Sequence, residues 1–563
     1  MKKRIVKILK KALKEKKVKL KDEEIENFLE IPPSPSMGDY AFPCFFLAEK
    51  FKQEPSQIAL EIREKIGNPP VMDFDDIQTS GPYINFILNR KNLAREVVWE
   101  VLTKKENYGK TNFGHNKKVV VDFSSPNIGK PFGIGHLRST IIGNSIANIC
   151  EFEGFKAIRI NYLGDWGTQF GRLIFGYLKF GNERKLHKDP IKHLLEIYVK
   201  VSKNKKYVEE SKEWFKKLEN RNQKAVILWR AFRELSLNEF KKIYKTLGIT
   251  FNDYDGESKY TKEMKKVIEE LKEKKLLKKS KGALIVNLKN HNLGVCLMQK
   301  SDGTTLYATR DIASAIKRYK KYKFEKMIYE VGQEQKLYFK QMFKVLELMG
   351  YSWAKSCIHV DHGLYLDKDR KKFSTRKGKT ILMEDIINET VSLAKKEIKK
   401  RTPRILKEEL EDRALKIAIA AIFYGDLKNN RKNDIVFNIK RFVSFEGDTG
   451  PYIQYSYARA SSILRKTVSK RKFEISELEP KEVELTKKLS EFSAVVLGAY
   501  ENLNPSIIAN YSYQLAQIFN EFYHSCPVMD SEQEEFRLAL VESFRQVLRN
   551  ALKLLGINVV EEM

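Results

Sequence analysis

A strand, a glycine-rich turn, a helix and a second strand follow one another between Lys117 and Gly171, and this unit constrains the fold more than any other stretch. Residues 117–123 form a short apolar run rich in β-branched side chains, which is typical of a buried strand. Apolar residues then recur at helical intervals from Leu137 to Gly154, and residues 157–163 again have the composition of a strand. Such a βαβ unit predicts an α/β fold and directs the N-terminal N–H groups of its helix at an anion.

The turn of this unit contains Gly133, Gly135 and His136, which suggest a site for a nucleotide phosphate. Glycines let a phosphate approach the backbone, and a histidine can hydrogen-bond to it. The alternative is a tight turn before a helix with a buried histidine, and the turn alone does not decide between the two. Residues 161–171 place three more glycines around an acid, a tryptophan and an amide, in a loop at the carboxyl end of a strand, where ligands bind in open α/β sheets.

The length of 563 residues predicts several domains, because single cores stop growing at roughly 250–300 residues. No run of about 18 apolar residues is present, so we expect no membrane-spanning helix. Lysine and arginine number 104 against 73 acidic residues, which gives a net charge of +31. This excess indicates a polyanionic partner with nucleic acid as the first candidate, although a lysine-rich proteome would raise the charge in the same way.

The five cysteines are scattered and form no CxxC pair, so we interpret them as buried thiols in a reducing compartment. Cys357, His359 and His362 come nearest to a ligand cluster, but no further ligand accompanies them, and we predict no protein-ligated zinc. The basic, amphipathic segment 1–13 could be a mitochondrial targeting peptide. We favour an ordinary first helix, because acidic residues follow closely, and we expect a cytoplasmic protein.

Periodicity divides the first two thirds of the chain into three parts. Residues 1–90 are predicted to form a small α/β domain, in which 77–88 alternate like a single strand, and residues 91–116 a connecting helix and linker. Strands and helices alternate over 117–385, which predicts a nucleotide-binding α/β domain. A charged, mostly helical stretch at about 178–280 interrupts this domain as an insertion; a solvated helix face explains its lysines more readily than nucleic-acid contact does.

Beyond residue 385 the periods are helical throughout. They predict a helical connecting region at 386–450 and a helical bundle at 451–563, with no strand. Aromatic residues interleave with amides and bases at 452–459 and again at 513–523. Most of these aromatics are expected in the core of the bundle, and a minority could stack on unpaired bases.

A loop at 367–379, after the strand predicted at 357–364, contains seven basic residues with small ones between them. It could be no more than a solvent-exposed turn. We favour a mobile clamp on a polyphosphate, because cations at the edge of a nucleotide-binding sheet can stabilise charge as it develops on a leaving group.

Taken in order, these stretches resemble the arginyl-tRNA synthetases, a family of class I aminoacyl-tRNA synthetases, over nearly the whole chain. The matching segments are 124–140 (the HIGH-motif segment), 162–171, 306–311, 373–378 (a degenerate KMSKS loop), 445–452 and 554–557. Each match alone is modest, but their order and spacing make the resemblance specific.

The resemblance implies a Rossmann-like catalytic domain, a small N-terminal domain that grips the tRNA elbow, and a C-terminal α-helical anticodon-binding domain. It implies activation of L-arginine by ATP, with Mg²⁺, to arginyl-adenylate and pyrophosphate, followed by transfer of arginine to the 3′-terminal adenosine of its tRNA. No nucleophilic side chain is needed, because the substrate carboxylate attacks the α-phosphate and the protein positions the reactants. We expect a monomer that does not associate with membranes and that requires bound tRNA for arginine activation.

Carried over residue by residue, the resemblance places Tyr307 and Asp311 on the substrate guanidinium. The two are four residues apart and share one helix face if the helix begins by Tyr307. The other implied positions are Asp122 in the same pocket, Ser125 and Asn127 near the α-amino group and Gln335 near the α-carboxyl end. Asp122 could instead be a strand-end cap, and Gln335 a neighbour of a helix N-cap. Buried acids and planar acceptors favour a guanidinium over the ammonium of lysine.

For ATP, the resemblance implies two departures from the family pattern. Gly133 replaces the first histidine of the HIGH motif, so one phosphate-directed donor is missing. Thr375 replaces the second lysine of the KMSKS loop, and Lys130 holds the position from which a lysine compensates in such relatives. The residues expected at ATP are Gly133, Gly135, His136, Phe373, Ser374, Arg376 and Lys377, and those expected to act in catalysis are Lys130, Gly135, His136, Arg376 and Lys377.

Two groups of residues are implied to contact tRNA. Ser80, Tyr83 and Asn85 match positions that read a D-loop base in relatives, but all three differ from the usual residues, so the base stays open. Tyr455 and Arg459 are implied contacts in the C-terminal domain.

Three rival interpretations remain. A catalytically inactive paralogue that only binds tRNA is suggested by Gly133, but the retained His136, Asp311 and basic loop argue against it. A synthetase for cysteine would carry a zinc site, and one for glutamate or glutamine should offer basic residues where Tyr307 and Asp311 stand. A generic basic RNA-binding protein explains the charge and not the ordered motifs.

Overall fold

The computed structural model describes residues 2–34, 37–68, 72–301, 307–371, 381–467 and 473–563. The chain divides into two compact units, each assembled from separate stretches of sequence. The smaller unit comprises 1–105, 468–490 and 518–544, and the larger comprises 106–467, 491–517 and 545–563.

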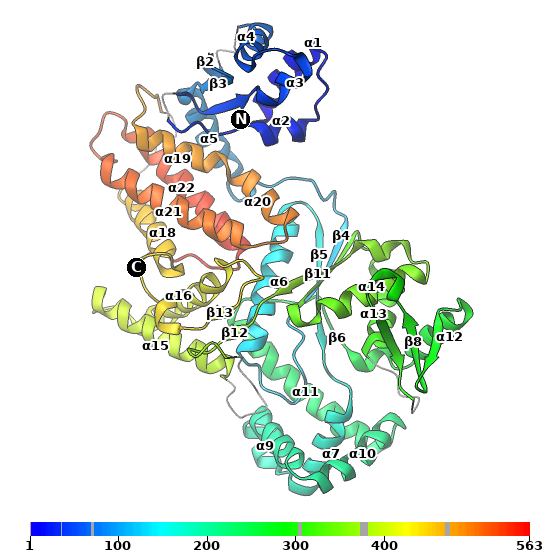
Figure 1. Ribbon diagram of the computed structural model, residues 1–563. Coiled ribbons are helices and arrows are strands. Elements are labelled where there is room, and N and C mark those ends of the chain that lie inside the picture. The colour runs from blue at the N-terminus through cyan, green and yellow to red at the C-terminus, as the bar shows by residue number, and fades with distance from the viewer. Residues whose placement is uncertain (1, 35–36, 69–71, 302–306, 372–380, 468–472) are drawn as a thin grey trace. The chain divides into compact units, whose positions relative to one another are not determined.

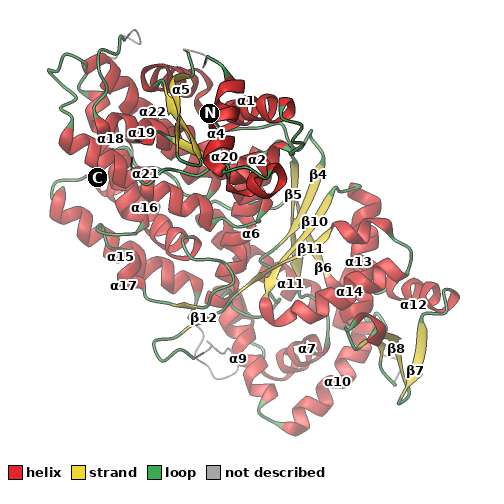
Figure 2. Ribbon diagram, turned by 45° about the horizontal axis from the view of Figure 1, so that its top comes forward, coloured by secondary structure: helices red, strands yellow, loops and turns green. Residues whose placement is uncertain are grey.

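A five-stranded, entirely parallel sheet in the order β11-β10-β4-β5-β6 forms the centre of the larger unit (Figures 1 and 2). Its strands are β4 (Lys118–Asp122), β5 (Lys156–Leu163), β6 (Asp253–Gly256), β10 (Lys326–Gly332) and β11 (Cys357–His362). Val119, Val120 and Val121 are each 0% exposed, as expected for a parallel strand covered on both faces. The predicted α/β fold is confirmed, and its central sheet is parallel.

Most of the stretch over 178–280 is helical as expected, but strand β6 at 253–256 was not predicted. The sequence Asp-Tyr-Asp-Gly of β6 lacks the apolar composition that identifies the other four strands. It forms a strand because its backbone pairs with the edge of β5, between Ile160 and Leu163. This pairing is a tertiary effect that leaves no local signal.

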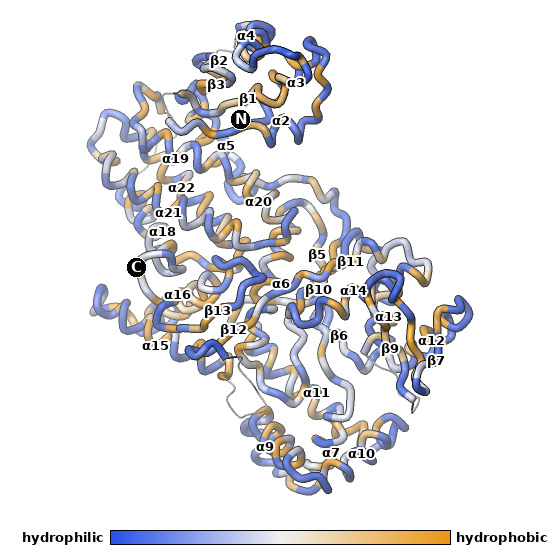
Figure 3. The backbone as a smooth tube through the Cα atoms, viewed as in Figure 1, coloured by the Kyte–Doolittle hydropathy of each residue, from blue (hydrophilic) through white to orange (hydrophobic). Residues whose placement is uncertain are grey.

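Helices connect the strands and cover both faces of the sheet. Helix α6 (Ile134–Phe152) joins β4 to β5 and begins three residues before the predicted Leu137, with Gly133 as its N-cap. The elements between β5 and β10 are α7 (Thr168–Phe180), α8 (Glu183–Lys188), α9 (Pro190–Ser202), α10 (Lys205–Glu219), α11 (Gln223–Thr246), α12 (Glu263–Glu273), β7 (Leu277–Ser280), β8 (Ala283–Asn287), β9 (Val295–Gln299) and α13 (Tyr307–Tyr322). Hydrophobic and hydrophilic residues alternate along helices such as α10, which is typical of helices with one packed face (Figure 3).

The smaller unit contains an antiparallel three-stranded sheet, in the order β1-β3-β2. Its elements include α1 (Lys2–Glu15), α2 (Asp22–Phe28), β1 (Tyr40–Pro43), α4 (Pro55–Ile66), β2 (Phe74–Ser80), β3 (Tyr83–Leu88), α5 (Arg90–Lys104) and α19 (Pro480–Ser490). The prediction of a single strand at 77–88 is wrong, because Gly81 with φ +54° reverses the chain and makes a hairpin of β2 and β3. The first helix is confirmed as α1.

The remaining C-terminal elements are helical with one small exception. They are α14 (Lys336–Leu348), β12 (Tyr365–Leu366), α15 (Met383–Arg401), α16 (Lys407–Leu427), β13 (Ile435–Val436), α17 (Ile439–Phe442), α18 (Gly450–Arg465), α20 (Phe492–Glu501), α21 (Ser506–Ser525) and α22 (Glu534–Leu554). The expectation of no strand after residue 385 is wrong at β13, which pairs with β12 and is too short to give a pattern. No described helix is long and apolar enough to cross a membrane.

Candidate active site

A cavity of about 530 Å³ lies where the carboxyl ends of β4, β5, β6 and β10 meet helix α13. This edge is where an open α/β sheet binds its ligands. The six residues predicted to hold arginine all line this one cavity: Asp122, Ser125, Asn127, Tyr307, Asp311 and Gln335. They come from three separate stretches of sequence, so their meeting is a property of the fold.

Helix α13 presents one complete face to the cavity. Tyr307, Asp311, Ser314 and Arg318 follow one another at intervals of four, three and four residues, and all four line it. The predicted sharing of a face by Tyr307 and Asp311 is confirmed. Arg318 continues that face and was not predicted, although its spacing from Asp311 is a signal that could have identified it.

Asp311 is the cavity-lining acid best placed to accept a cation. The Tyr338 hydroxyl donates a hydrogen bond to its carboxylate, and Asp311 makes no ion pair with any described residue. Burial raises the pKa of Asp311 to about 6, so the carboxyl is mostly ionised at neutral pH. An ionised, unpaired carboxylate in a partly enclosed cavity is a strong site for a guanidinium.

Glu257 is the third acid that lines the cavity, and sequence reasoning missed it. It directly follows β6 and lies 3.1 Å from Arg310. Burial raises the pKa of the Glu257 carboxyl to about 7. Because the sequence of β6 does not identify it as a strand, the position of Glu257 at the carboxyl end of the sheet could not be predicted from the sequence alone.

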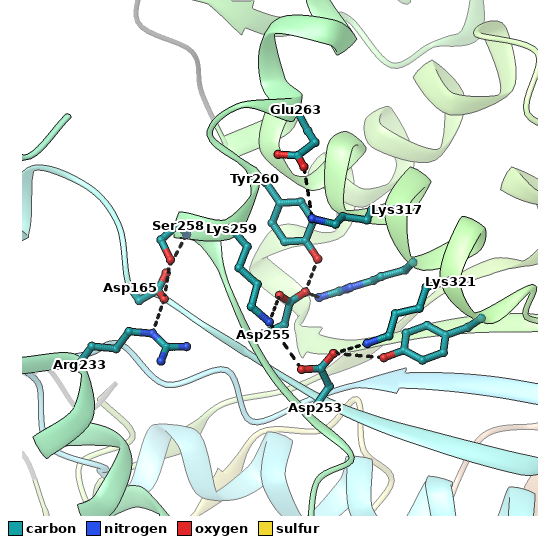
Figure 4. A network of polar contacts seen from close by, with 12 residues as sticks. Asp165, Arg233, Asp253, Asp255, Ser258, Lys259, Tyr260, Glu263, Lys317 and Lys321 are labelled. Atoms are coloured by element: carbon teal, nitrogen blue, oxygen red, sulfur yellow. Dashed lines mark hydrogen bonds and ion pairs between the residues drawn. The ribbon is translucent and has the colours of Figure 1, made fainter. Parts of the chain in front are cut away.

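Asp165, from the glycine-rich loop at 161–171, fixes the segment that carries Glu257 (Figure 4). It is fully buried, and its carboxylate accepts hydrogen bonds from Ser258 N and Oγ at 2.8 and 2.9 Å and from Arg233 Nε at 2.8 Å. The Trp229 indole donates to the Asp165 carbonyl oxygen over 2.8 Å. Asp165 therefore joins the end of β5, helix α11 and the turn after β6.

The backbone after β4 takes a conformation that side chains rarely adopt. Ser124 and Ser125 have φ of +72° and +43°. The structure holds Ser124 there with hydrogen bonds, since its N–H donates to Ser139 Oγ over 2.9 Å and its hydroxyl lies 2.7 Å from that of Tyr244. In this backbone conformation, Ser125 Oγ lies 3.2 Å from Asp122 Oδ1. Such strain is characteristic of functional sites.

Asn127 is held against the backbone of Gly164. A Cβ at Gly164 would lie only 2.3 Å from Asn127 Oδ1. We expect Gly164→Ala to displace the amide, to raise KM for arginine about tenfold and to cost about 1–3 kcal/mol of folding free energy. Steady-state pyrophosphate exchange and thermal unfolding measure the two effects. Gly498→Ala is the control, because nothing lies within 4 Å of a Cβ there; equal behaviour of the two variants would contradict this interpretation.

At the turn before α6, Gly133 and His136 are paired. The Gly133 N–H donates to His136 Nδ1 over 3.3 Å, which leaves Nε2 as the protonated nitrogen of the neutral ring. Burial, with the nearby charge of Lys130, lowers the pKa of His136 to about 4. A Cβ built on Gly135 would meet nothing within 4 Å, so space is open beside it. The His136 ring is therefore a neutral hydrogen-bond donor at this turn.

Lys130 lies partly exposed on the same loop, with Nζ 5.7 Å from the centre of the Tyr198 ring of α9. The structure thus keeps Lys130 beside the turn predicted to bind phosphate. Phe373, Ser374, Thr375, Arg376 and Lys377 lie outside the described residues.

The residues predicted to contact tRNA lie in both units. In the smaller one, Ser80 and Tyr83 flank the β2–β3 turn, and Tyr83 packs edge-on against the exposed Phe45 with ring centres 5.4 Å apart. Asn85 is only 6% exposed on the central strand β3, so it is less suited to direct base contact than Tyr83. In the larger unit, the Arg459 guanidinium lies 4.9 Å from the centre of the Tyr455 ring on α18.

The described residues contain no group of three or more His, Cys, Asp or Glu side chains that could hold a metal ion. The nearest candidates from the sequence have other partners. His359 Nε2 lies 3.0 Å from the Val331 carbonyl, and His362 Nδ1 lies 2.7 Å from Glu330 Oε1. Cys357 is buried as a free thiol.

Comparison with protein families and solved structures gives a consistent result over the whole chain. Family models described as arginyl tRNA synthetase N terminal domain, tRNA synthetases class I (R) catalytic domain, and DALR anticodon binding domain match residues 2–88, 97–439 and 453–563. The arginine–tRNA ligase of Clostridium perfringens is 46% identical over 557 residues, covering 97% of this chain and 98% of that protein. That of Clostridium acetobutylicum is 44% identical over 570 residues, covering 98% and 100%.

Two solved structures share the fold from end to end. The arginyl-tRNA synthetase of Thermus thermophilus has a TM-score of 0.83 at 25% identity and covers all of both chains. That of Plasmodium falciparum has a TM-score of 0.82 at 27% identity, covering 100% of this chain and 99% of that one. The ordered motifs, the cavity and these likenesses agree, and the chain belongs to the arginyl-tRNA synthetase family.

Proposed function

We propose that this protein activates L-arginine with ATP, as its Mg²⁺ complex, and transfers the arginyl group to the 3′ end of its cognate tRNA. The observation that carries the proposal is the convergence on one cavity of the six residues that the resemblance implies for arginine, with Asp311 making no ion pair among the described residues. The substrate carboxylate attacks the α-phosphate of ATP, pyrophosphate leaves, and the 3′-terminal ribose then displaces AMP. Catalysis rests on positioning and charge stabilisation.

In the arginine site, the guanidinium lies against the Asp311 carboxylate, with Tyr307 beside it and Glu257 across the cavity. A planar guanidinium can donate to a carboxylate through two parallel N–H groups, which the ammonium of lysine cannot do. Ser125 and Asn127, on the strained loop after β4, receive the α-amino group. Gln335 lies near the α-carboxyl end, and Asp122 lines the same cavity.

In the ATP site, we assign His136 Nε2 as a donor to phosphate and the open space beside Gly135 as the path of the nucleotide. The Gly133 N–H orients the histidine ring through its Nδ1. Phe373, Ser374, Arg376 and Lys377 form the basic loop over the phosphates in this proposal.

Lys130 is proposed as the cation that compensates for Thr375. We expect Lys130→Ala to lower the rate of ATP–pyrophosphate exchange about tenfold or more, because one charge on the phosphates is lost. Lys192→Ala, an exposed lysine of α9, is the control. Unchanged exchange in the Lys130 variant would remove this assignment.

The pH dependence of arginine binding follows from Asp311. Its pKa is raised to about 6, so the carboxyl becomes protonated and loses its charge as the pH falls through that value. We expect KM for arginine to be nearly constant above pH 7 and to rise below pH 6, approaching tenfold per pH unit. A KM that stays level from pH 5 to pH 8 would contradict the role of Asp311.

For tRNA, we propose that residues 1–90 bind the elbow, with Ser80, Tyr83 and Asn85 on or beside the contact surface. We propose that 451–563 bind the anticodon through Tyr455 and Arg459, that 91–116 and 386–450 connect these parts, and that 117–385 carry catalysis with the insertion at about 178–280. The protein acts as a monomer in the cytoplasm; sedimentation with and without tRNA tests the oligomeric state.

The decisive experiment is aminoacylation with arginine, ATP-Mg²⁺ and homologous tRNA, with lysine and citrulline as competing amino acids. We expect charging with arginine alone. No charging under conditions in which tRNA still binds would reject the proposal and favour a tRNA-binding paralogue. Charging with another amino acid would show that the cavity has been misassigned.

A further inference from the structure

The face of α13 that lines the cavity carries one arginine, Arg318, so a guanidinium of the protein lies in the cavity proposed for a guanidinium substrate. Arg318 is 2% exposed, lies two helical turns beyond Asp311, and lines the cavity. A buried cation beside a site for a cationic substrate would weaken binding by repulsion unless its charge is compensated. The structure supplies that compensation.

Arg318 joins two acids from different strands. Its Nη1 lies 2.6 Å from Asp122 Oδ2 at the end of β4, and its Nη2 lies 3.6 Å from Asp255 Oδ2 in β6. Its guanidinium carbon lies 4.8 Å from the centre of the Tyr162 ring in β5. One side chain on α13 therefore contacts all three neighbouring strands at their carboxyl ends.

Asp122 and Asp255, the two acids that pair with Arg318, are each connected to residues that line the cavity. Asp122 Oδ1, the oxygen not facing Arg318, accepts the hydrogen bond of Ser125 Oγ over 3.2 Å. Asp255 lies two residues before Glu257, and it also accepts from the Tyr260 hydroxyl and pairs with Lys259 at 3.2 Å (Figure 4). A change in the position of Arg318 would therefore affect Ser125, which is proposed to receive the α-amino group, and Glu257, an acid that lines the cavity.

The ion pairs also divide the acids that line the cavity into those with a basic partner and one without. Asp122 is compensated by Arg318, and Glu257 by Arg310 at 3.1 Å. Asp311 remains as the lining acid without an ion pair to a described residue. An added guanidinium therefore meets one uncompensated carboxylate and not three.

We propose that Arg318 is a positioning residue for arginine recognition. By pairing with Asp122, Arg318 holds that carboxylate where it accepts the hydrogen bond of Ser125. Asp122 then does not contact the substrate guanidinium, which binds Asp311. This inference rests on the proposed arginine activation. A lysine could not replace Arg318 fully, because a single ammonium cannot reach both Asp122 and Asp255 while stacking on Tyr162.

The test is arginine-dependent ATP–pyrophosphate exchange, measured with homologous tRNA present, for Arg318→Lys and Arg318→Met in the full chain. We expect KM for arginine to rise about tenfold in Arg318→Lys and about a hundredfold in Arg318→Met, since removal of one partner leaves a buried charge uncompensated. KM for ATP and kcat should stay within about threefold. Lys317→Met, the exposed neighbour on α13 that pairs with Glu263 at 3.2 Å, is the matched control and should change none of these.

Double variants separate positioning from direct contact. If Asp122 acts through Arg318, Arg318→Met combined with Asp122→Asn should raise KM no more than the larger single change, because both charges of the pair are then gone. Arg318→Met combined with Asp311→Asn should multiply the two single effects. The inference would be overturned if the KM increases of Arg318→Met and Asp122→Asn multiplied in the double variant. It would also be overturned if a folded Arg318→Lys protein had an unchanged KM for arginine.

Failure of this inference differs from failure of the proposed function. Wild-type protein that does not activate arginine even with homologous tRNA present rejects the function, and with it this role. Wild-type activity with unaltered Arg318 variants rejects only the role of Arg318. Loss of kcat with unchanged KM for arginine would likewise reject it, in favour of general structural support.

Discussion

Asp311→Asn is expected to lower kcat/KM for arginine by about 10²- to 10³-fold, the largest effect that we predict for a single change. The substitution keeps the shape of the side chain and its contact with the Tyr338 hydroxyl but removes the uncompensated charge in the cavity. Loss of one partner of a desolvated ion pair costs about 3–5 kcal/mol. Pyrophosphate exchange at varied arginine concentrations measures this loss, which should appear mainly in KM.

The matched control for this change is Glu347→Gln. Glu347 is an exposed acid on α14 that pairs with Lys344 at 3.1 Å, so the same chemical change is made away from the cavity. Its kinetics should match those of the wild-type protein, because surface pairs contribute about 0–1 kcal/mol. If Asp311→Asn stayed within threefold of wild type, the guanidinium site would have to be placed at Glu257.

His136→Ala is expected to reduce kcat for adenylate formation by about 10²- to 10³-fold, with little change in KM for arginine. The ring is a preorganised donor beside the open space at Gly135, and removal of one such donor has effects of this size. Gly133 already leaves this turn with one histidine fewer than the family pattern, so His136 carries more of the task. Single-turnover formation of arginyl-adenylate measures the chemical step directly.

The protonation of His136 gives this prediction a second readout. Because its pKa is lowered to about 4, the ring is neutral throughout pH 5–8. The wild-type rate of adenylate formation should therefore show no inflection from His136 in that range. His291→Ala, which replaces an exposed histidine, is the control and should be silent. An unaffected adenylation rate in His136→Ala would move the phosphate site away from this turn.

The parts of the site that were predictable have strong local patterns. The β-branched run of β4, the glycine turn and the helical period of α6 identify the βαβ unit, because composition and periodicity within each element are local signals. Tyr307 and Asp311 were predictable as one face because helix geometry alone fixes their relation. Their roles needed the family resemblance, since spacing cannot specify a substrate.

The parts that were missed depend on contacts between distant residues. Strand β6 is polar and short, and only its pairing with β5 makes it a strand. Glu257 reaches the cavity because Asp165, some ninety residues earlier, holds Ser258. The hairpin of β2 and β3 was predicted as one strand because strand-like composition continues on both sides of the reversal at Gly81.

The sequence by itself determined the α/β class and the helix face that Tyr307 and Asp311 share, because both follow from local periodicity. Only the tertiary structure decided which acids remain uncompensated. Asp122, Glu257 and Asp311 are chemically alike along the chain, but folding pairs the first with Arg318 and the second with Arg310. The energy of an ion pair depends on the distance between its two charges in the folded protein and on their burial, and the order of residues along the chain does not specify that distance.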